Sequence, residues 1–378
     1  LGIETIGVDG SADAPGLPLA ATAEVGDILD PILLAGLARK HRVHGIYAAA
    51  ELAVEAVAVA ATELGLPGLS PAAATRARNK LRMREALARA GLPVPAFRGV
   101  TTAEEAADAA EAIGFPLIVK PADANSSKGV QRVDAAQQVA PAFHHALPHA
   151  RSRVVLLEGF LDGVEFGVDG LIYEGAYRLG GITAKKLSPL PYRYDQALFM
   201  PPPISDSDVQ AIETCVADAL HAIGVVTATT HVEVMMTADG PRIVEMAARP
   251  GGALIPTDLI PNAHGFDFIA DSLRLCVGEA PRHRQEFNKG ACIYWLPAEP
   301  GLVEGFEGVE EAKQLPGVLD VFIRAKRGDV LAPRIDCVTR DAIGYVLTRG
   351  ETAQEALATA EAACLVCRVV TSEVAVPL

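Results

Sequence analysis

Two glutamates and an arginine lie close together in the stretch THVEVMMTADGPRIVEMAARPGG, which reads as a β-hairpin turning at Asp239–Gly240. Glu233 and Glu245 are twelve residues apart across that turn, so they can face each other on adjacent strands. Opposed carboxylates repel unless a cation lies between them, and hard oxygen ligands suit a Mg²⁺ ion that also holds nucleotide phosphates. An exposed acidic ribbon is the alternative, but the Val, Met and Ile residues on both arms favour a half-buried functional face.

Two further residues of the same hairpin can take part in chemistry. Arg249 can neutralise a developing anion, because its guanidinium matches a carboxylate or a phosphate. His231 shares a face with Glu233 and could orient an amine or accept its proton. A structural histidine explains His231 at least as well.

Lys120 ends the apolar run PLIVKP and is followed by the small-residue loop ADANSSKGV. A lysine anchored on a strand gives a fixed positive charge. The loop, with Ser126, Ser127 and Gly129, lets backbone N–H groups approach phosphate oxygens. The loop is not a P-loop motif, and a surface turn beside an edge strand is an equally good interpretation.

A third element is EGFL at residues 158–161, followed by Glu165. A strand that runs into this sequence can present backbone groups to an adenine edge, and a carboxylate can accept hydrogen bonds from ribose hydroxyls. Taken alone, a strand ending in a turn with solvated acids is the better interpretation.

The elements that must position these residues follow from hydrophobic period and turn signals. Alternation of strands and helices over residues 1–75 predicts a parallel sheet. The predicted helices cover residues 28–41, 51–64, 71–90, 101–113, 134–150 and 206–223. The predicted strands cover residues 5–9, 43–49, 115–121, 131–133, 154–161, 164–175, 176–186, 291–296, 318–324 and 342–348, besides the hairpin.

Residues 188–207 are rich in Pro and Tyr and predict a loop. Tyr192, Arg193, Tyr194 and Asp195 could line a substrate pocket there, with Arg193 pairing a carboxylate and Asp195 an ammonium. An ordinary surface loop is the equal alternative.

The charge balance, apolar runs and cysteines of the sequence exclude some classes of protein. The 378 residues carry 33 Lys+Arg and 47 Asp+Glu, a net charge of −14, and the pI is about 5.1. This argues against a nucleic-acid binder, and no uncharged apolar run approaches the roughly 20 residues that span a bilayer. The six cysteines, including the Cys364–Cys367 pair, read as structural thiols of a cytoplasmic protein. The opening LGIETIGVDG looks like the second strand of an α/β unit, so we expect a strand and turn before it.

Lys80, VKP…SSKGV, EGFLDGVEFGVDG and HVEVMMTADGPRIVEMAARPGG occur in an order that resembles the ATP-grasp superfamily of carboxylate–amine ligases. The resemblance covers almost the whole chain. It implies an α/β fold with an N-terminal doubly wound parallel-sheet domain, two α+β subdomains that clamp ATP, and a small C-terminal α+β domain. The implied boundaries are 1–90, 91–285 with a lid at about 115–185, and 286–378.

The resemblance also implies residue roles. Lys80 and Lys120 would contact ATP phosphates, with Ser126, Ser127 and Gly129 in the lid loop above them. Glu158, Phe160 and Leu161 would frame adenine, and Glu165 the ribose. Lys185 would face the substrate or phosphates, Glu233 and Glu245 would hold Mg²⁺ (or Mn²⁺), and Arg249 would stabilise the tetrahedral intermediate.

One position departs from the pattern, because Ala247 stands where many members have a metal-binding Asn. The sequence E-x-A-A-R with a Gly pair, and the C-terminal hundred residues, are instead similar to the L-amino-acid ligase branch. That branch makes dipeptides through an acyl phosphate. The implied partners are a small-molecule carboxylate and amine, in a homodimer. A carboxylase-type enzyme that uses bicarbonate and a non-catalytic ATP-binding protein remain the alternatives.

Overall fold

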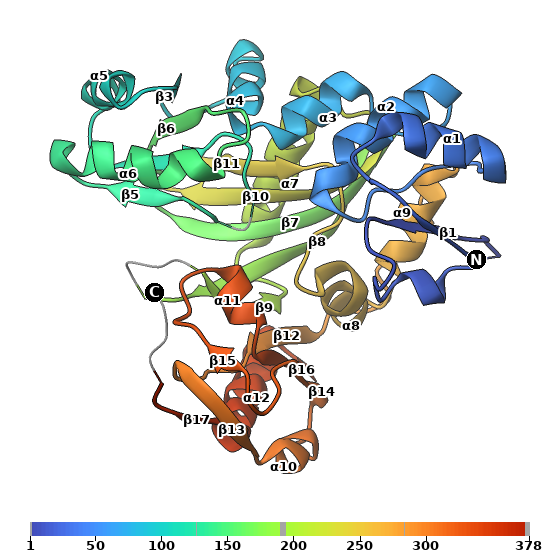
Figure 1. Ribbon diagram of the computed structural model, residues 1–378, viewed down its shortest axis with the longest axis vertical. Coiled ribbons are helices and arrows are strands. Elements are labelled where there is room, and N and C mark those ends of the chain that lie inside the picture. The colour runs from blue at the N-terminus through green and yellow to red at the C-terminus, as the bar shows by residue number, and fades with distance from the viewer. Residues whose placement is uncertain (1, 126, 190–193, 283, 375–378) are drawn as a thin grey trace.

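The computed structural model describes the chain except residues 1, 126, 190–193, 283 and 375–378 (Figure 1). Within the described residues the strands form a parallel pair, a four-stranded sheet, an eight-stranded sheet and a three-stranded sheet. Figure 1 places the four-stranded sheet and the N-terminal helices in the upper part of the molecule, beside the first strands of the large sheet, and the C-terminal elements, which include the last strands of that sheet, in the lower part. None of the helices described is long and apolar enough to cross a membrane.

The N-terminal part contains the parallel strands β1 (Ile6–Asp9) and β2 (Thr22–Val25) and the helices α1 (Pro31–His41) and α2 (Val54–Leu64). A short 3-10 helix, η2 (Glu51–Ala53), leads into α2. The strand predicted for residues 43–49 does not form. These residues lie against helix α9 instead: a Cβ added at Gly45 would be 2.0 Å from the carbonyl oxygen of Cys276. The apolar pattern of this segment therefore serves packing without a partner strand.

The helix predicted over residues 71–90 is two helices, α3 (Pro71–Arg78) and α4 (Lys80–Arg89). Asn79 separates them with an extended backbone, and its side chain accepts a hydrogen bond from Arg82 N. Asn is a favoured N-cap residue, so it ends one helix and begins the next. The break places Lys80 at the first position of α4.

The four-stranded antiparallel sheet has the order β3 (Phe97–Val100), β6 (Val155–Gly159), β4 (Leu117–Pro121), β5 (Gln131–Val133). The helices α5 (Ala103–Ile113) and α6 (Val139–Ala146) pack on it around a core that includes Phe143 and Leu157. Thr102 caps α5 by accepting a hydrogen bond from Glu105 N. This unit carries Lys120 and Glu158 on adjacent strands.

The eight-stranded sheet is antiparallel throughout. Its order is β11 (Gly240–Ala247), β10 (Ala228–Thr237), β7 (Val164–Tyr173), β8 (Ala176–Leu187), β9 (Asp195–Met200), β12 (Gly290–Trp295), β16 (Gly344–Gly350) and β14 (Val318–Ile323). The hairpin of β10 and β11 is confirmed. The loop predicted for residues 188–207 is wrong over β9, which pairs with β8 and β12 and buries Ala197, Leu198 and Met200.

One face of β7 and β10 is apolar. Phe166, Val168, Val232 and Val234 belong to a core shared with α7 (Asp206–Ala222) and the α3–α4 pair. Because side chains alternate along a strand, the residues between them point to the opposite face. Glu165, Asp169, His231 and Glu233 are therefore placed on that second face.

The C-terminal part extends the large sheet. Strands β12, β14 and β16 lie beyond residue 286, where the sequence predicts a domain boundary, and helix α12 (Ala353–Val366) packs on them. The domain boundaries stay a prediction. The remaining elements are β13 (Gly301–Glu307), β15 (Val330–Leu331), β17 (Arg368–Ser372), α8 (Ile260–His264), α9 (Phe268–Cys276), α10 (Val309–Lys313), α11 (Cys337–Asp341), η1 (Leu17–Leu19), η3 (Ala136–Gln138), η4 (Leu147–His149) and η5 (Ile255–Leu259).

Candidate functional site

The two glutamates of the hairpin lie opposite each other, as predicted: Glu233 pairs with Glu245, and a β-bulge follows Glu233. Their side chains are 29% and 35% exposed, so both carboxylates are open to the surface of the sheet. Lysines from other elements approach each of them. The ammonium of Lys80 lies 3.0 Å from Glu245 Oε1, and that of Lys185 lies 2.8 Å from Glu233 Oε1.

Lys185 comes from β8 and lies between two carboxylates, with Glu165 Oε1 at 2.5 Å on its other side. Burial disfavours the ammonium, but Glu233 and Glu165 outweigh burial and hold the pKa of Lys185 well above its usual value. Burial likewise opposes ionisation of Glu233, yet Lys185 lowers the pKa of Glu233 to about 2. At neutral pH the site therefore contains a charged lysine and an ionised glutamate.

A second charged group joins the four-stranded sheet to the hairpin. Glu158 accepts hydrogen bonds from Lys120 Nζ and, at 2.9 Å, from Arg84 Nε. The Arg84 guanidinium also donates to the carbonyl oxygens of Ile243 and Val244, at 2.5 and 3.1 Å. These carbonyls immediately precede Glu245, so one buried arginine connects the lysine of β4 to the strand that carries a candidate metal ligand.

Burial and charge act against each other in this group. The pKa of Glu158 falls to about 2, because the charges of Arg84 and Lys120 outweigh the burial that opposes ionisation. Burial lowers the pKa of Lys120. Because the carboxylate of Glu158 is engaged by these cations, a contact between Glu158 and adenine would have to come from its backbone.

The loop after β4 is anchored at its base by Lys80, whose ammonium donates to the carbonyl oxygen of Ala124 at 2.6 Å. Gly129 is buried with φ +71°, and a Cβ there would lie 2.9 Å from His149 Cδ2, so only glycine fits. Ser127 is exposed, and Ser126 lies outside the described residues.

The predicted adenine residues lie beside the same sheet. Phe160 follows β6, and the guanidinium of Arg132 stacks 4.4 Å from its ring centroid. Leu161 is half-buried next to it. Their role in binding adenine stays a prediction.

His231 is held by a carboxylate that sequence reasoning missed. Asp169 of β7 is fully buried, and its Oδ2 lies 3.0 Å from His231 Nδ1. Its other oxygen accepts a hydrogen bond from Gly251 N at 3.0 Å. The spacing Glu165-x-x-x-Asp169 on one face of a strand is the signal that could have found it.

Arg249 follows β11 and reaches the N-terminal part of the chain. Its Nε donates to Glu51 Oε2 at 2.6 Å, and an Nη atom donates to the carbonyl oxygen of Pro250, also at 2.6 Å. Glu51 is the first residue of the helix predicted over residues 51–64. Without a view of the fold, no sequence signal connects it to Arg249.

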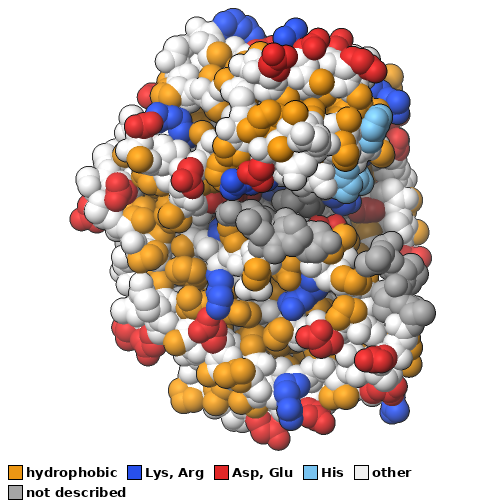
Figure 2. Space-filling view, turned by 90° about the vertical axis from the view of Figure 1, so that its left-hand side faces the viewer, with side chains coloured by type: hydrophobic (Ala, Val, Ile, Leu, Met, Phe, Trp, Pro, Cys, Tyr) orange, Lys and Arg blue, Asp and Glu red, His pale blue; other side chains and the backbone are white. Residues whose placement is uncertain are grey.

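The predicted substrate loop is only partly described. Tyr192 and Arg193 lie outside the described residues. Tyr194 is buried, and Asp195 pairs with Arg340, whose Nη1 lies 3.5 Å from Asp195 Oδ2. Asp195 therefore already has a cationic partner from the C-terminal part. Figure 2 shows the face on the left-hand side of Figure 1. A hollow runs across the middle of this face, with charged side chains of both signs along it.

The donor set fits a divalent cation held jointly with a ligand. Glu233 and Glu245 offer carboxylate oxygens from neighbouring strands, and hard cations prefer oxygen ligands. No cluster of three or more His, Cys, Asp or Glu side chains suited to a metal occurs among the residues described. A Mg²⁺ ion here would need further oxygens, which nucleotide phosphates and water supply. Ala247 adds none.

The geometry and family comparisons agree on the class. The family described as "ATP-grasp domain" matches residues 113–258, which contain both the four-stranded sheet's Lys120–Glu158 pair and the hairpin. Residues 113–258 therefore form an ATP-grasp domain. A second family, "L-amino acid ligase C-terminal domain 2", matches residues 294–372, so the chain combines the ATP-grasp domain with the C-terminal domain of that ligase group.

Individual proteins are similar to most or to part of the chain. The solved L-amino acid ligase from Bacillus licheniformis has a TM-score of 0.84 and 25% identity, over 98% of this chain and 93% of its own. The uncharacterized protein y4rH of Sinorhizobium fredii is 29% identical over 82% of this chain, and the matched region spans 65% of the length of y4rH. The formate-dependent phosphoribosylglycinamide formyltransferase of Azotobacter vinelandii is 36% identical over 43% of this chain, or 42% of that enzyme.

Proposed function

We propose that this protein is an ATP-dependent ligase that joins the carboxylate of an amino acid to an amine through an acyl phosphate. The observation that carries the proposal is the opposed Glu233–Glu245 pair, with Lys80 and Lys185 at its sides and Arg249 beyond it. The matches to an ATP-grasp domain and to an L-amino acid ligase C-terminal domain supply the context.

The nucleotide would lie between the two sheets. Lys80 and Lys120 would contact its phosphates, and the backbone of residues 158–161 would face adenine. Glu165 would accept hydrogen bonds from the ribose. The loop of Ser127 and Gly129 would close over the phosphates, because an acyl phosphate exposed to water hydrolyses.

Glu233 and Glu245 would hold Mg²⁺, which supplies charge neutralisation for the phosphates, and Mn²⁺ would suit the same oxygens. Lys185 already neutralises Glu233 within the protein, at 2.8 Å. It can also turn its ammonium toward an entering phosphate or carboxylate. Such preorganised charge is usually the largest single contribution to catalysis.

The reaction would proceed in two displacements. A carboxylate oxygen of the first substrate attacks the γ-phosphorus of ATP, the bond to the bridging oxygen breaks, and ADP leaves. The neutral amine of the second substrate then attacks the acyl carbon, loses its proton, and inorganic phosphate leaves. Arg249 would stabilise the oxyanion of the intermediate, and His231, fixed by Asp169, would orient the amine or take its proton.

The test is phosphate release from ATP and Mg²⁺ with single and paired amino acids, followed by mass spectrometry. Release that needs two amino acids, with a product lighter than their sum by one water, is the expected result. Glu245→Gln is the matched inactive control. Release that needs bicarbonate or formate in place of an amino acid would overturn the amino-acid assignment, and ATP binding without release in every mixture would overturn the ligase.

A further inference from the structure

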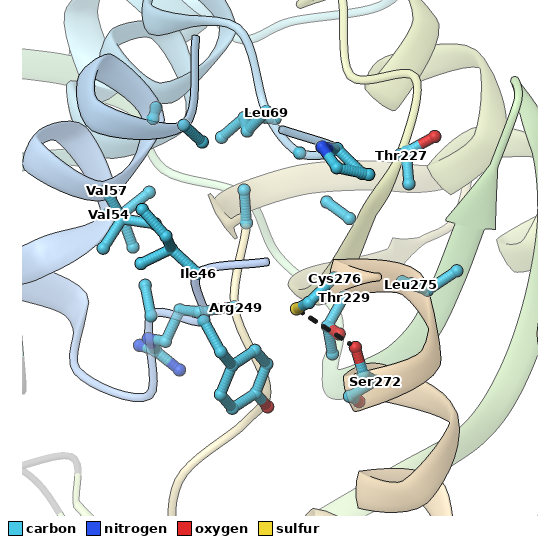
Figure 3. Close-up of a pocket in the computed structure, with 18 residues that line it drawn as sticks. Ile46, Val54, Val57, Leu69, Thr227, Thr229, Arg249, Ser272, Leu275 and Cys276 are labelled. Carbon is cyan, nitrogen blue, oxygen red and sulfur yellow. Dashed lines mark hydrogen bonds between the residues drawn. The ribbon is translucent and has the colours of Figure 1, made fainter. Parts of the chain in front are cut away.

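A cavity lies between the N-terminal part and the large sheet, next to Arg249. Its walls are mostly apolar: Val54 and Val57 of α2 lie on one side, and Leu275 and Cys276 of α9 lie on the other (Figure 3). Ala61 of α2 also lines it. The cavity has a volume of about 60 Å³. Since one water molecule needs about 10–15 Å³, the cavity has room for roughly four to six atoms of that size.

The cavity continues the face that carries the candidate site. His231 pairs with Ala247, and Thr229 and Arg249, which both line the cavity, lie two residues beyond that pair. The period of two places Thr229 on the face of His231 and Glu233, about 7 Å further along β10, whereas Arg249 follows the end of β11 and lines the same cavity. A ligand that reaches from the cavity to the hairpin would therefore pass Arg249.

The charges beside the cavity are balanced. Arg249 pairs with Glu51 at 2.6 Å, with side chains 19% and 14% exposed. Arg78 approaches Glu51 at 4.0 Å and Glu55 at 3.0 Å. The two arginines and two glutamates sum to zero. A zwitterion preserves this balance, whereas a bare carboxylate or a bare ammonium does not.

One wall also offers an unused hydrogen-bonding group. Tyr47 lines the cavity, and its hydroxyl is buried beside the side chain of Ser272 without a hydrogen bond of normal geometry to any residue that the structure describes. Buried hydroxyls are normally paired, so an orphan of this kind points to a ligand or water that completes it.

We propose that this cavity holds the aliphatic side chain of the amino acid whose carboxylate is activated, with its ammonium on Glu51 and its carboxylate on Arg249. The inference rests on the proposed ligase function and names the class of the acyl donor. The volume fits a side chain of about four heavy atoms, such as that of leucine or methionine. Tyr47 adds a hydrogen bond to the bound amino acid.

Side-chain selectivity tests the pocket. The measurement is kcat/KM for phosphate release with alanine, leucine and phenylalanine as acyl donor, the donor being identified by mass spectrometry of the product. We expect leucine to exceed alanine by at least about tenfold, since a methylene in an apolar pocket changes rates by roughly 10–200-fold. Ala61→Val should lower the leucine value about tenfold and spare alanine. Val57→Ala should raise the phenylalanine value.

Val59→Ala is the matched control, because it makes the same change on the same helix at a side chain that points to solvent, 39% exposed. Equal ranking of the donors in the wild type would overturn the pocket. Loss of selectivity in Val59→Ala to the same degree as in Val57→Ala would also overturn it.

Glu51 has its own readout, the preference for leucine over 4-methylpentanoate, which lacks the amino group. The wild type should prefer leucine by about 10–100-fold, and Glu51→Gln should reduce this preference to a few-fold. An unchanged preference would remove Glu51 from ammonium recognition.

If no amino acid supports phosphate release, the proposed function fails, and calorimetric titration of the protein with leucine tests the pocket by itself. Binding weakened by Ala61→Val supports it, and no binding to the wild type overturns it.

Discussion

Two lysine–glutamate pairs in this molecule use the same chemical groups in different surroundings. In the pair of Lys120 and Glu158 both side chains are 5% exposed, and Arg84 closes the far side of the carboxylate. In the hairpin, Glu233 and Glu245 are 29% and 35% exposed. The enclosed carboxylate can only support the structure, whereas the open pair can receive a ligand. Exposure, rather than charge, separates the two roles.

The largest effect on folding should come from the enclosed pair. Glu158→Gln leaves Arg84 and Lys120 buried without a counter-charge, and breaking a buried ion pair costs about 3–5 kcal/mol. We expect the free energy of unfolding to fall by that amount in urea denaturation. Glu310→Gln removes a carboxylate that is 76% exposed and should change it by less than about 1 kcal/mol. Equal losses in the two variants would contradict the comparison.

The open pair should behave in the opposite way. Glu245→Gln should reduce ATP-dependent phosphate release by at least about 100-fold, the scale of removing one fixed electrostatic contact. Its stability should change by less than about 1 kcal/mol, because the side chain is partly solvated and amide replaces acid at constant size. Turnover and urea denaturation measured on one preparation check both statements. Unchanged turnover would remove Glu245 from the metal site.

Arg249→Ala should separate chemistry from nucleotide binding. The guanidinium lies near Glu51 rather than beside Lys80 or Lys120, so its loss should lower kcat by about 10–100-fold and leave KM for ATP within about threefold. Steady-state kinetics with ATP varied at saturating substrates measure the two constants. A loss confined to KM for ATP would place Arg249 on the nucleotide instead.

A further effect should appear only in acid. The pKa of Glu158 is about 2 in the folded protein, against the ordinary value of 4.5 expected in the unfolded chain. A depressed carboxyl pKa contributes stability that is present above pH 4.5 and is lost as the pH falls toward 2. Over that window the free energy of unfolding of the wild type should fall more steeply than that of Glu158→Gln. Parallel curves would show that Glu158 titrates with its ordinary pKa in the folded protein.

The sequence was most informative where structure is local. The facing of Glu233 and Glu245 follows from a period of two and an Asp-Gly turn within twenty residues. The partnership of Arg84 and Glu158 joins residues 74 apart, and Arg84 contacts carbonyls 159 and 160 residues away. Nothing in the local pattern of α4 distinguishes Arg84 from its solvent-facing neighbours.

Two errors have a common physical cause. Residues 43–49 have the sequence pattern of a strand but do not pair with another strand. In contrast, β9 lies in a Pro- and Tyr-rich stretch and pairs with two strands, β8 and β12. Pairing is decided by neighbours that are distant in sequence, and β propensity depends on that context. The break at Asn79 was missed because the helical period continues across it.

The continuity of the large sheet across residue 286 has a consequence for dissection of the protein. In a truncated chain that ended there, β9 would lose β12 and become an unprotected edge strand, with a row of backbone N–H and C=O groups exposed. Such edges recruit other chains, so the fragment should aggregate. A chimera that exchanges C-terminal domains would have to preserve the pairing of β9 with β12, because the boundary between the two parts lies inside one sheet.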